Sequence, residues 1–299
     1  AGPGDGRLAA AVSQAGALGM VGVGAARTPE WIAEQAVIAA EPGRPFGFGL
    51  MAWAVQQTPE QLDAVLDAGP ALVSVSFGDV APHVERIRDA GVAVAVQAGT
   101  LQEAVSAERS GADLVVARGA EAGGHGRDAV GTLTLLQVVL ETLDVPVLAA
   151  GGIGTARGLA AVLACGAAGA WVGTALLGCP EAANSATARQ RLFAAESTDT
   201  GYGRVFDVAQ GLGWPPEYGG RALANAFFER WRTRLDELAG DDEAAAELAQ
   251  ARAAEDYDTA YLYVGQGVGM LARQRSVAEV IADLAHAEDL LAAFPASGA

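Results

Sequence analysis

The segment Val145-Pro-Val-Leu-Ala-Ala-Gly-Gly-Ile-Gly-Thr155 joins a short apolar run to a glycine-rich turn and to a threonine that can cap a following helix. An apolar run of this kind is typical of a strand that is buried on both faces, as in a parallel sheet. Glycines after such a strand let backbone N–H groups approach an anion, and a helix start adds a favourable dipole. The segment therefore predicts a βα unit with a binding loop at the carboxyl end of its strand.

The same unit repeats through the first part of the chain. Apolar or β-branched runs alternate with helical patterns, several of which begin at a threonine that can act as an N-cap, such as Thr28, Thr58 and Thr100. Strands that alternate with helices imply a parallel sheet, and a repeat of roughly 20 to 33 residues suits a barrel or a doubly wound sheet. The predicted strands cover residues 18–23, 46–52, 72–77, 92–97, 113–117, 145–150 and 168–173.

A (β/α)8 TIM barrel, an α/β fold, is the architecture that this repeat favours. The doubly wound alternative is weakened because the GxGxxG dinucleotide fingerprint is absent after the first predicted strand, where Gly22-Val-Gly24 is followed by Ala-Ala-Arg. The predicted strands leave the barrel one short. Since a helical pattern over residues 7–15 directly precedes the first of them, we expect the missing first strand to lie before residue 1.

Beyond about residue 180 the sequence changes to charged and aromatic helical patterns interrupted by glycine-rich loops. We predict three regions. The TIM barrel covers residues 1–180, and an appended C-terminal helical and loop region over 181–275 covers the active-site face. The third region, residues 276–299, is a C-terminal helix that packs on the barrel. One predicted helix covers residues 220–238. Its aromatic residues could form a homodimer contact or an internal core, and the core is favoured: they are Phe227, Phe228 and Trp231.

The charge balance excludes several classes of protein. With 36 acidic and 19 basic residues, the net charge of −17 repels nucleic acid and anionic membranes. Every basic residue is an arginine, so enzymes that depend on a lysine Schiff base are excluded. No apolar run approaches the length of a membrane span. The two cysteines, Cys165 and Cys179, lack metal-ligand spacing, so we expect no metal site and a reduced, cytoplasmic protein.

Two glycine-rich loops point to a phosphate site. The loop at residues 149–155 and the segment Trp171-Val-Gly-Thr174 follow the last two predicted strands. Either loop alone is equally explained as a tight strand-to-helix turn. Together they occupy the place where TIM barrels recurrently bind phosphate, so phosphate binding is the favoured interpretation.

A third loop, Arg118-Gly-Ala-Glu-Ala-Gly-Gly-His-Gly-Arg127, follows the predicted strand at 113–117 and carries His125 between glycines. A histidine at the carboxyl end of a barrel strand is suited to move a proton, so His125 is the candidate catalytic acid or base; the alternative is an exposed loop histidine without a role. Glu121 could be a second acid, although a solvated carboxylate or an ion pair is favoured. His83 and His286 are expected on helices, facing solvent. Two further segments are expected to line the rim: Trp53 and Phe77-Gly-Asp79.

In order and spacing, three segments resemble the nitronate monooxygenase family, formerly called 2-nitropropane dioxygenases: Gly119-Ala-Glu-Ala-Gly-Gly-His125, Ala149-Ala-Gly-Gly-Ile153 and Val172-Gly-Thr174. The resemblance extends from Ala1 through the barrel to Arg204–Gln210 and Gly265-Gln-Gly267. It implies oxidation of an alkyl nitronate by O2, giving a carbonyl compound and nitrite, with FMN as cofactor and His125 as catalytic acid or base. The FMN-binding residues that it implies are Arg118, Gly123, Gly124, Gly151, Gly152, Trp171, Val172, Gly173 and Thr174.

This sequence departs from the family pattern at two positions, because Arg118 stands where the family often has Gln and Gly49 where it often has Asn. The histidine motif is shared with FMN-dependent enoyl reductases, so a reductase that uses NAD(P)H on an enoyl thioester is the main alternative. A catalytically silent flavin-binding barrel is another. A sugar-phosphate barrel without FMN is disfavoured, since the sequence shows neither paired carboxylates at strand ends nor a lysine.

Overall fold

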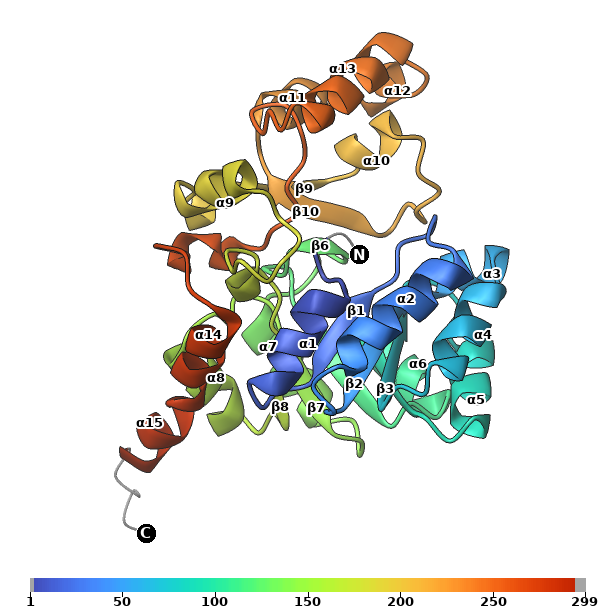
Figure 1. Cartoon of the computed structure of the whole chain (residues 1–299), viewed down its shortest axis with the longest axis vertical. Helices are drawn as coiled ribbons and strands as arrows, with labels where there is room; N and C mark the ends of the chain where they lie inside the picture. Colours follow the sequence, from blue (N-terminus) through green and yellow to red (C-terminus); the bar gives the residue numbers. More distant parts are fainter. Residues whose placement is uncertain (1–2, 294–299) are drawn as a thin grey trace.

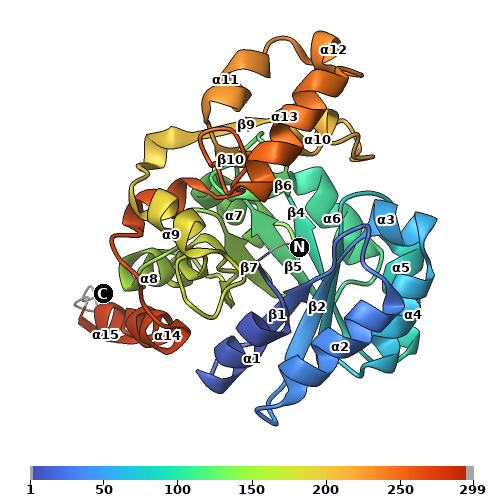
Figure 2. The same cartoon turned by 45° about the horizontal axis from the view of Figure 1, so that its top comes forward.

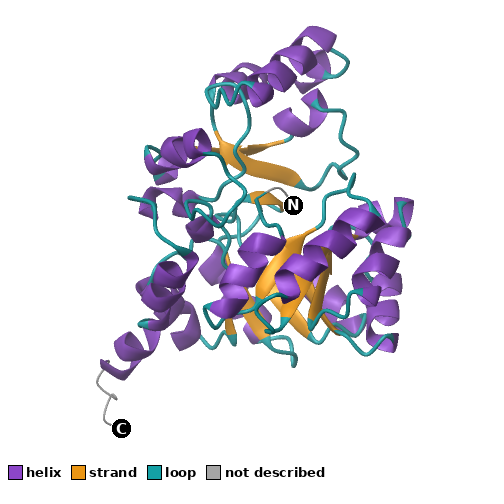
Figure 3. Cartoon of the chain, in the orientation of Figure 1, coloured by secondary structure: helices purple, strands orange, loops and turns teal. Residues whose placement is uncertain are grey.

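The strands of the first part of the chain form one parallel sheet that curls as in a TIM barrel, with helices over its outer face (Figures 1 and 3). The computed structural model describes residues 3–293. Neighbours in the sheet follow the chain order β1-β2-β3-β4-β5-β7-β8. The strands are β1 (Gly19–Gly22), β2 (Phe46–Met51), β3 (Leu72–Ser76), β4 (Ala93–Ala98), β5 (Leu114–Arg118), β7 (Val147–Ala150) and β8 (Gly169–Ala170).

All seven predicted strands are confirmed, with ends that differ by a few residues. Within residues 3–293, β1 pairs only with β2 and β8 only with β7. The predicted strand before residue 1 lies outside the described residues. The sheet is parallel throughout, so the carboxyl ends of its strands meet at one edge and bring their loops together.

Helices connect the strands and pack their apolar faces on the sheet. They are α1 (Gly6–Gln14), α2 (Pro29–Ala40), α3 (Ala52–Gln57), α4 (Glu60–Asp67), α5 (Ala81–Asp89), α6 (Leu101–Arg109), α7 (Thr132–Leu140) and α8 (Ala156–Ala164). The predicted caps at Thr28 and Thr100 are confirmed, because their hydroxyls accept from Trp31 N–H and Glu103 N–H. The expectation for Thr58 is wrong, since α4 has Pro59 at its N-cap and no side-chain cap bond.

The appended region lies over the carboxyl ends of the strands (Figures 1 and 2). It contains a small antiparallel sheet of order β6-β10-β9, in which β6 (Gly124–Gly126) comes from the loop after β5. The other two strands are β9 (Thr200–Gly203) and β10 (Gly219–Leu223). This shared sheet joins the appended region to the barrel loop that carries His125.

The appended region is helical as predicted, but the single helix expected over 220–238 is wrong. Gly219 and Gly220 belong to β10, since glycine weakens a helix and here allows close pairing with β6 and β9. The helix that follows begins only after Asn225, whose side chain accepts from Phe228 N–H. The helices are α9 (Ala186–Phe193), α10 (Val205–Ala209), α11 (Ala226–Trp231), α12 (Leu235–Leu238) and α13 (Asp242–Ala253), with 3-10 turns η1 (Thr174–Leu176), η2 (Ser197–Asp199) and η3 (Gln266–Met270).

Two apolar cores stabilise these parts. The barrel core fills the sheet and its helices, with Phe48 and Leu135 fully buried. The appended region has its own core around Phe206, where the predicted core aromatics Phe227, Phe228 and Trp231 are all buried. This confirms the interior position that was favoured for those three side chains.

The C-terminal segment packs on the barrel side of the molecule. The helix expected from residue 276 onward is two helices, α14 (Val277–Ala285) and α15 (Ala287–Ala293), which meet at His286. Val277 and Val280 of α14 are buried beside Leu8 of α1. The last part of the predicted region, residues 294–299, lies outside the described residues. Among the residues that the structure describes, no helix is long and apolar enough to cross a membrane.

Candidate active site at the carboxyl ends of the strands

His125 lies on β6 and is held by a buried carboxylate of the appended region. Its Nε2 is 2.8 Å from Oδ1 of Asp207, which belongs to α10 and is 1% exposed. The hydroxyl of Tyr263 donates to the same oxygen over 3.1 Å. Burial and the neighbouring Asp207 charge raise the pKa of Tyr263 above its ordinary value, so the phenol stays a donor. The structure thus connects the predicted catalytic histidine to a carboxylate more than eighty residues away in sequence.

Two aromatic rings pack against the imidazole of His125. The indole of Trp214 stacks on His125 with ring centroids 3.7 Å apart and planes 3° apart, and Tyr263 lies tilted at 5.0 Å. Gly220 of β10 makes this packing possible, because a Cβ there would lie 2.5 Å from Cε1 of Tyr263 and 3.4 Å from Nε2 of His125. These contacts, with the bond to Asp207, hold the His125 ring in this orientation.

The same aromatic cluster reaches the rim residues that the sequence predicted. Trp53, after β2, and Phe77, after β3, lie with ring centroids 5.3 and 5.5 Å from Trp214. Phe77 has a φ of 68°, a strained conformation for a residue that is not glycine and one that tends to occur at functional sites. Tyr218 closes the cluster at 5.4 Å from Phe77. The structure confirms that Trp53 and Phe77 line the rim beside His125.

Arg118, at the end of β5, holds the loop that leads to His125. It is buried, and its Nη2 donates to the carbonyl oxygens of Gly123 and Gly124 at 2.8 and 3.0 Å. Burial lowers the pKa of Arg118 to about 10. These carbonyl contacts give Arg118 a structural role in shaping the loop, and the cofactor contact expected from the sequence stays a prediction.

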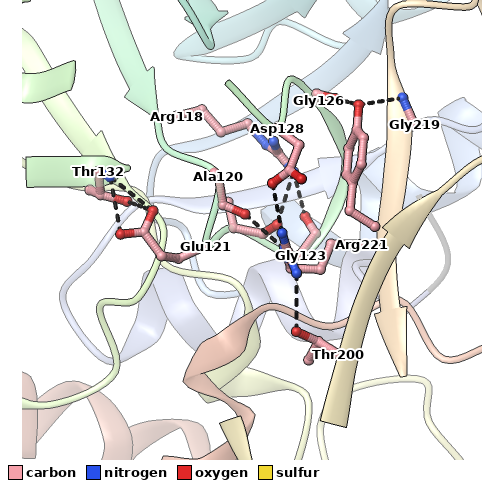
Figure 4. A network of polar contacts seen from close by, with 12 residues as sticks. Arg118, Ala120, Glu121, Gly123, Gly126, Asp128, Thr132, Thr200, Gly219 and Arg221 are labelled. Atoms are coloured by element: carbon pink, nitrogen blue, oxygen red, sulfur yellow. Dashed lines mark hydrogen bonds and ion pairs between the residues drawn. The ribbon is translucent and has the colours of Figure 1, made fainter. Parts of the chain in front are cut away.

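A second buried arginine ties the loop to the appended region (Figure 4). Arg221 of β10 donates from Nε to the Ala120 carbonyl at 2.7 Å, pairs with Asp128 at 2.7 Å, and donates to Oγ1 of Thr200 at 3.2 Å. Nearby, the hydroxyl of Tyr202 donates to the Gly126 carbonyl at 2.9 Å. The histidine loop is therefore fixed from both its barrel side and its appended side.

Glu121 has a role that differs from both sequence interpretations. Its carboxylate accepts from the backbone N–H and the hydroxyl of Thr132, each at 2.8 Å, at the start of α7 (Figure 4). The described contacts of Glu121 thus place it at a helix start, rather than in an ion pair with Arg118 or Arg127. The Arg127 side chain pairs with Glu103 at 2.8 Å, and Tyr218 donates to that same carboxylate at 3.0 Å.

The two predicted phosphate loops lie side by side. Gly151 and Gly152 follow β7 with φ of 115° and 69°, conformations that favour glycine. Residues after the neighbouring strand β8 reach the same edge, because Ala149 of β7 is paired with Ala170. Gly154 confirms the closeness of the loops, since a Cβ there would lie 3.7 Å from the Cβ of Ala175.

The loops present donors that the protein itself leaves free. Within residues 3–293, no backbone carbonyl accepts the N–H of Gly151, Gly152 or Gly173. A Cβ at Gly173 would meet nothing within 4 Å, so this turn faces open space. The hydroxyl of Thr174 accepts from Gly265 N–H at 3.0 Å and keeps its own hydrogen to donate. This donor set fits a phosphate group.

The remaining predicted residues of this site differ in what they contact. Trp171 N–H is used by the sheet, donating to the Ala149 carbonyl at 2.8 Å, and Val172 continues the turn beside the apolar cores. Gly123 packs directly against Gly265, because a Cβ on Gly123 would lie within the backbone of that segment. Gly124, with a φ of 73°, faces open space. Among residues 3–293, no cluster of three or more His, Cys, Asp or Glu is placed to hold a metal ion.

Comparison with known proteins places this site in a family. The family model described as nitronate monooxygenase matches residues 49–287. The chain belongs to the nitronate monooxygenase family. The matched range contains His125, its partners Asp207 and Tyr263, and both predicted phosphate loops.

Individual relatives of the nitronate monooxygenase family agree with this placement. The chain is 33% identical to a nitronate monooxygenase of Pseudomonas aeruginosa over 243 residues, which are 76% of this chain and 66% of that protein. It resembles the solved structure of nitroalkane oxidase from Streptomyces ansochromogenes with a TM-score of 0.82 at 30% identity, over 97% of this chain and 94% of the other. FabK from Thermotoga maritima is similar with a TM-score of 0.82 at 26% identity, over 97% and 90%.

The matched part of the chain spans less than two thirds of the curated relatives, 62–66% of the first of them. The solved neighbours confirm the TIM-barrel fold with its appended region. The nitronate monooxygenase resemblance that the sequence motifs gave is likewise confirmed at the level of the family.

Several residues that complete the site were not predicted from the sequence. Asp207, Trp214, Arg221 and Tyr263 come from the appended region and reach His125 or its loop only through the fold. One local signal was available for Asp207, a single carboxylate inside the apolar run Val205–Ala209. Such a buried charge needs a partner, which marks it as a candidate.

Proposed function

We propose that this protein is a flavin-dependent oxidoreductase that binds FMN and oxidises small alkyl nitronates with O2, giving a carbonyl compound and nitrite. The observation that carries the proposal is the pairing of His125 with buried Asp207 beside an edge of the barrel that offers free phosphate donors. Family membership supports the reaction class. We further propose that the barrel and the appended region act together as the functional unit, since His125 and Asp207 come from the two parts.

In this proposal Gly151, Gly152, Gly173 and Thr174 hold the phosphate of FMN. Among the described residues no backbone carbonyl accepts the N–H of the three glycines, and a Cβ at Gly173 would meet nothing within 4 Å. Bound FMN would supply the electron chemistry of the reaction. Gly123 and Gly124 would flank its ring, with Trp171 and Val172 lining the phosphate side. Arg118 keeps the Gly123–Gly124 backbone in place through its carbonyl contacts.

The protein residues supply orientation and proton transfer. His125 is oriented by Asp207 and covered by Trp214, so it can hold or move a proton next to a bound substrate while one face is shielded from water. The aromatic side chains of the rim, Trp53, Phe77 and Trp214, pack against one another at an angle and offer an apolar wall. A small alkyl group fits such a wall, and the anionic nitronate head fits a donor beside it.

The test begins with the visible spectrum of the purified protein, alone and after FMN is added. A small alkyl nitronate is then supplied with O2, and oxygen consumption and nitrite are measured. We expect FMN to bind with about one equivalent per chain and nitrite to form. His125→Ala is expected to bind FMN normally and to lose nitrite formation, whereas the matched variant of an exposed histidine, His286→Ala, is expected to keep it.

Other outcomes of the same experiment assign the site differently. If nitronate gives no nitrite but NADH reduces the bound flavin and an enoyl thioester reoxidises it, the protein is an enoyl reductase instead. A protein that binds FMN and reacts with neither substrate is a catalytically silent flavin protein. A protein that binds no FMN at all overturns the proposed cofactor.

A further inference from the structure

We propose that Nδ1 of His125 is the nitrogen that exchanges a proton with the substrate, and that Asp207 is a positioning residue that fixes the imidazole in the Nε2–H tautomer. Tyr263 supports Asp207 in this role. The inference deepens the proposed function and rests on it for the identity of the substrate. The assignment of the tautomer itself rests only on the contacts of these three side chains.

The contacts at Nε2 define where the ring proton sits. Oδ1 of Asp207 lies 2.8 Å from Nε2, and a carboxylate in its ionised form can only accept hydrogen bonds. The hydrogen between the two atoms must therefore belong to Nε2. Tyr263 donates its hydroxyl hydrogen to the same Oδ1 at 3.1 Å, which adds a second donor to this oxygen. Two donors on one oxygen hold the carboxylate in line with the ring.

Because Asp207 is buried, its carboxylate depends on these two hydrogen bonds. Asp207 is 1% exposed, and its second oxygen, Oδ2, has no hydrogen-bond partner among the described residues. A buried carboxylate with few partners depends strongly on those it has, because it has lost most of its hydration. The bonds from His125 and Tyr263 are the ones that the structure shows for this carboxylate side chain within residues 3–293. Asp207 thus favours a proton on Nε2 of His125.

The second ring nitrogen of His125, Nδ1, is available to a substrate. Within the described part of the chain, Nδ1 of His125 has no hydrogen-bond partner, and it is not among the fully buried side-chain atoms that lack one. Trp214 covers one face of the ring, and Tyr263 packs at an angle beside it. Gly124, next to His125 in the chain, presents no side chain and has open space at its Cα. In the proposed Nε2–H tautomer, Nδ1 is the ring nitrogen that is left to meet a substrate.

The three side chains come from separate elements, so the arrangement is a product of the fold. His125 is on β6, Asp207 on α10, and Tyr263 in the segment that bridges to Ala222 of β10. Their closest approach depends on Gly220, whose missing side chain leaves room for Tyr263 and for Nε2. The same logic operates in hydrolases where a buried aspartate holds a catalytic histidine in its working tautomer.

The test reads the tautomer directly in the protein with FMN bound and without it. Protein labelled with ¹⁵N at histidine is studied by long-range ¹H–¹⁵N correlation at a pH where the ring is neutral, and the three histidines are assigned with His83→Gln and His286→Gln. We expect His125 to carry its hydrogen on Nε2, with Nδ1 unprotonated. A hydrogen on Nδ1 in the unmodified protein would overturn the proposal.

Variants then test whether Asp207 enforces this state. In Asp207→Asn the amide can donate to Nε2, so we expect the hydrogen to move to Nδ1 and kcat to fall by up to about 10⁴-fold, as for a histidine held in the wrong tautomer. KM and FMN affinity are expected to change less than about twofold, since the shape is kept. Tyr263→Phe removes one hydrogen bond to a charged group and is expected to lower kcat about tenfold while the Nε2–H tautomer persists.

The outcomes separate this inference from the proposed function. An Nε2–H tautomer that is lost in Asp207→Asn, in a protein that releases no nitrite from any nitronate, supports the positioning role and overturns the proposed substrate. Full kcat in a folded Asp207→Asn protein overturns the positioning role and leaves the proposed function intact. If Asp207→Asn does not fold, Tyr263→Phe provides the test. The inference is overturned if Tyr263→Phe leaves kcat unchanged and the wild-type protein carries the ring hydrogen of His125 on Nδ1.

Discussion

The imidazole of His125 and the indole of Trp214 lie parallel, with their centroids 3.7 Å apart and their planes 3° apart. The two residues belong to different parts of the molecule, one to the barrel loop at β6 and the other to the segment between α10 and β10. The Trp214 side chain therefore limits which substrates can reach the face of the catalytic candidate. Gly211, with a φ of 63°, begins this segment.

Trp214→Ala is predicted to widen the site. Removing the indole exposes the imidazole face to water and deletes a stacking contact, so kcat/KM for a short nitronate is expected to fall roughly tenfold. Activity with bulkier alkyl nitronates should fall less or rise. The measurement is kcat/KM over a series of chain lengths. Leu212→Ala, an exposed position of the same segment, is the matched control, and an equal effect of both variants would show that loop stability is being measured.

Gly220→Ala is predicted to disturb His125 from a position that touches no substrate. The added methyl would lie 2.5 Å from Cε1 of Tyr263 and 3.4 Å from Nε2, so the ring pair must shift. Small displacements of a catalytic group can lower kcat by about 10²-fold. Steady-state kinetics should show a drop in kcat with FMN affinity retained. Gly213→Ala is the comparison, because its methyl would approach only Trp53 at 3.8 Å, and kcat unchanged by Gly220→Ala would contradict the packing argument.

Local patterns in the sequence were sufficient for the barrel and insufficient for the completed site. Each strand of the parallel sheet is a continuous apolar run bounded by turn residues, which is why all of them could be predicted. The pairing of β6 with β10 joins residues such as His125 and Gly220, which are far apart in sequence. The pattern Gly-Gly-Arg-Ala-Leu resembles a helix start as much as a strand, and only the partner strands decide it.

The sequence likewise indicated some residues of the candidate site and not others. The positions of His125 and of the two glycine-rich loops could be predicted because they sit at strand ends, where a barrel places functional groups. Arg118 was expected at a cofactor, which stays a prediction. Its described hydrogen bonds go to loop carbonyls, because a buried guanidinium needs acceptors, and the sequence did not indicate them. Asp207 and Tyr263 have no motif of their own, and their role depends on a tertiary contact.

Glu121→Gln distinguishes a capping residue from a second catalytic acid. The carboxylate accepts hydrogen bonds from the backbone N–H and the hydroxyl of Thr132. The amide oxygen of glutamine can keep only some of these bonds, and it carries no charge. The free energy of unfolding is predicted to fall by about 1 kcal/mol with kcat within about threefold of wild type. Urea unfolding and kinetics check this. Thr132→Val should give a similar loss of stability, and a selective collapse of kcat in Glu121→Gln would instead indicate an acid role.

Tyr218 is predicted to make the folded protein sensitive to alkaline pH. Burial, with Glu103 beside it, raises the pKa of Tyr218 from its ordinary value of 10.0 to about 12. Because the folded pKa is raised, the stabilisation is fully present below pH 10 and is lost as pH rises toward about 12. Urea unfolding at a series of alkaline pH values should show this decline, and Tyr218→Phe, which cannot ionise, should flatten it. An identical decline in both proteins would contradict the assignment to Tyr218.

Gly173→Asp tests the phosphate loops by charge. A Cβ at Gly173 meets nothing within 4 Å, so the variant should fold, but its carboxylate would face the donors proposed to hold the phosphate of FMN. Repulsion between two anions at close range near a protein surface is on the order of 4 kcal/mol, so FMN affinity should fall by at least about 10²-fold. Quenching of FMN fluorescence measures the Kd. Val37→Asp makes the same charge change on exposed α2 and should bind FMN as the wild type does, which separates a local effect from the change in net charge. Equal affinity in Gly173→Asp and Val37→Asp would place the phosphate elsewhere.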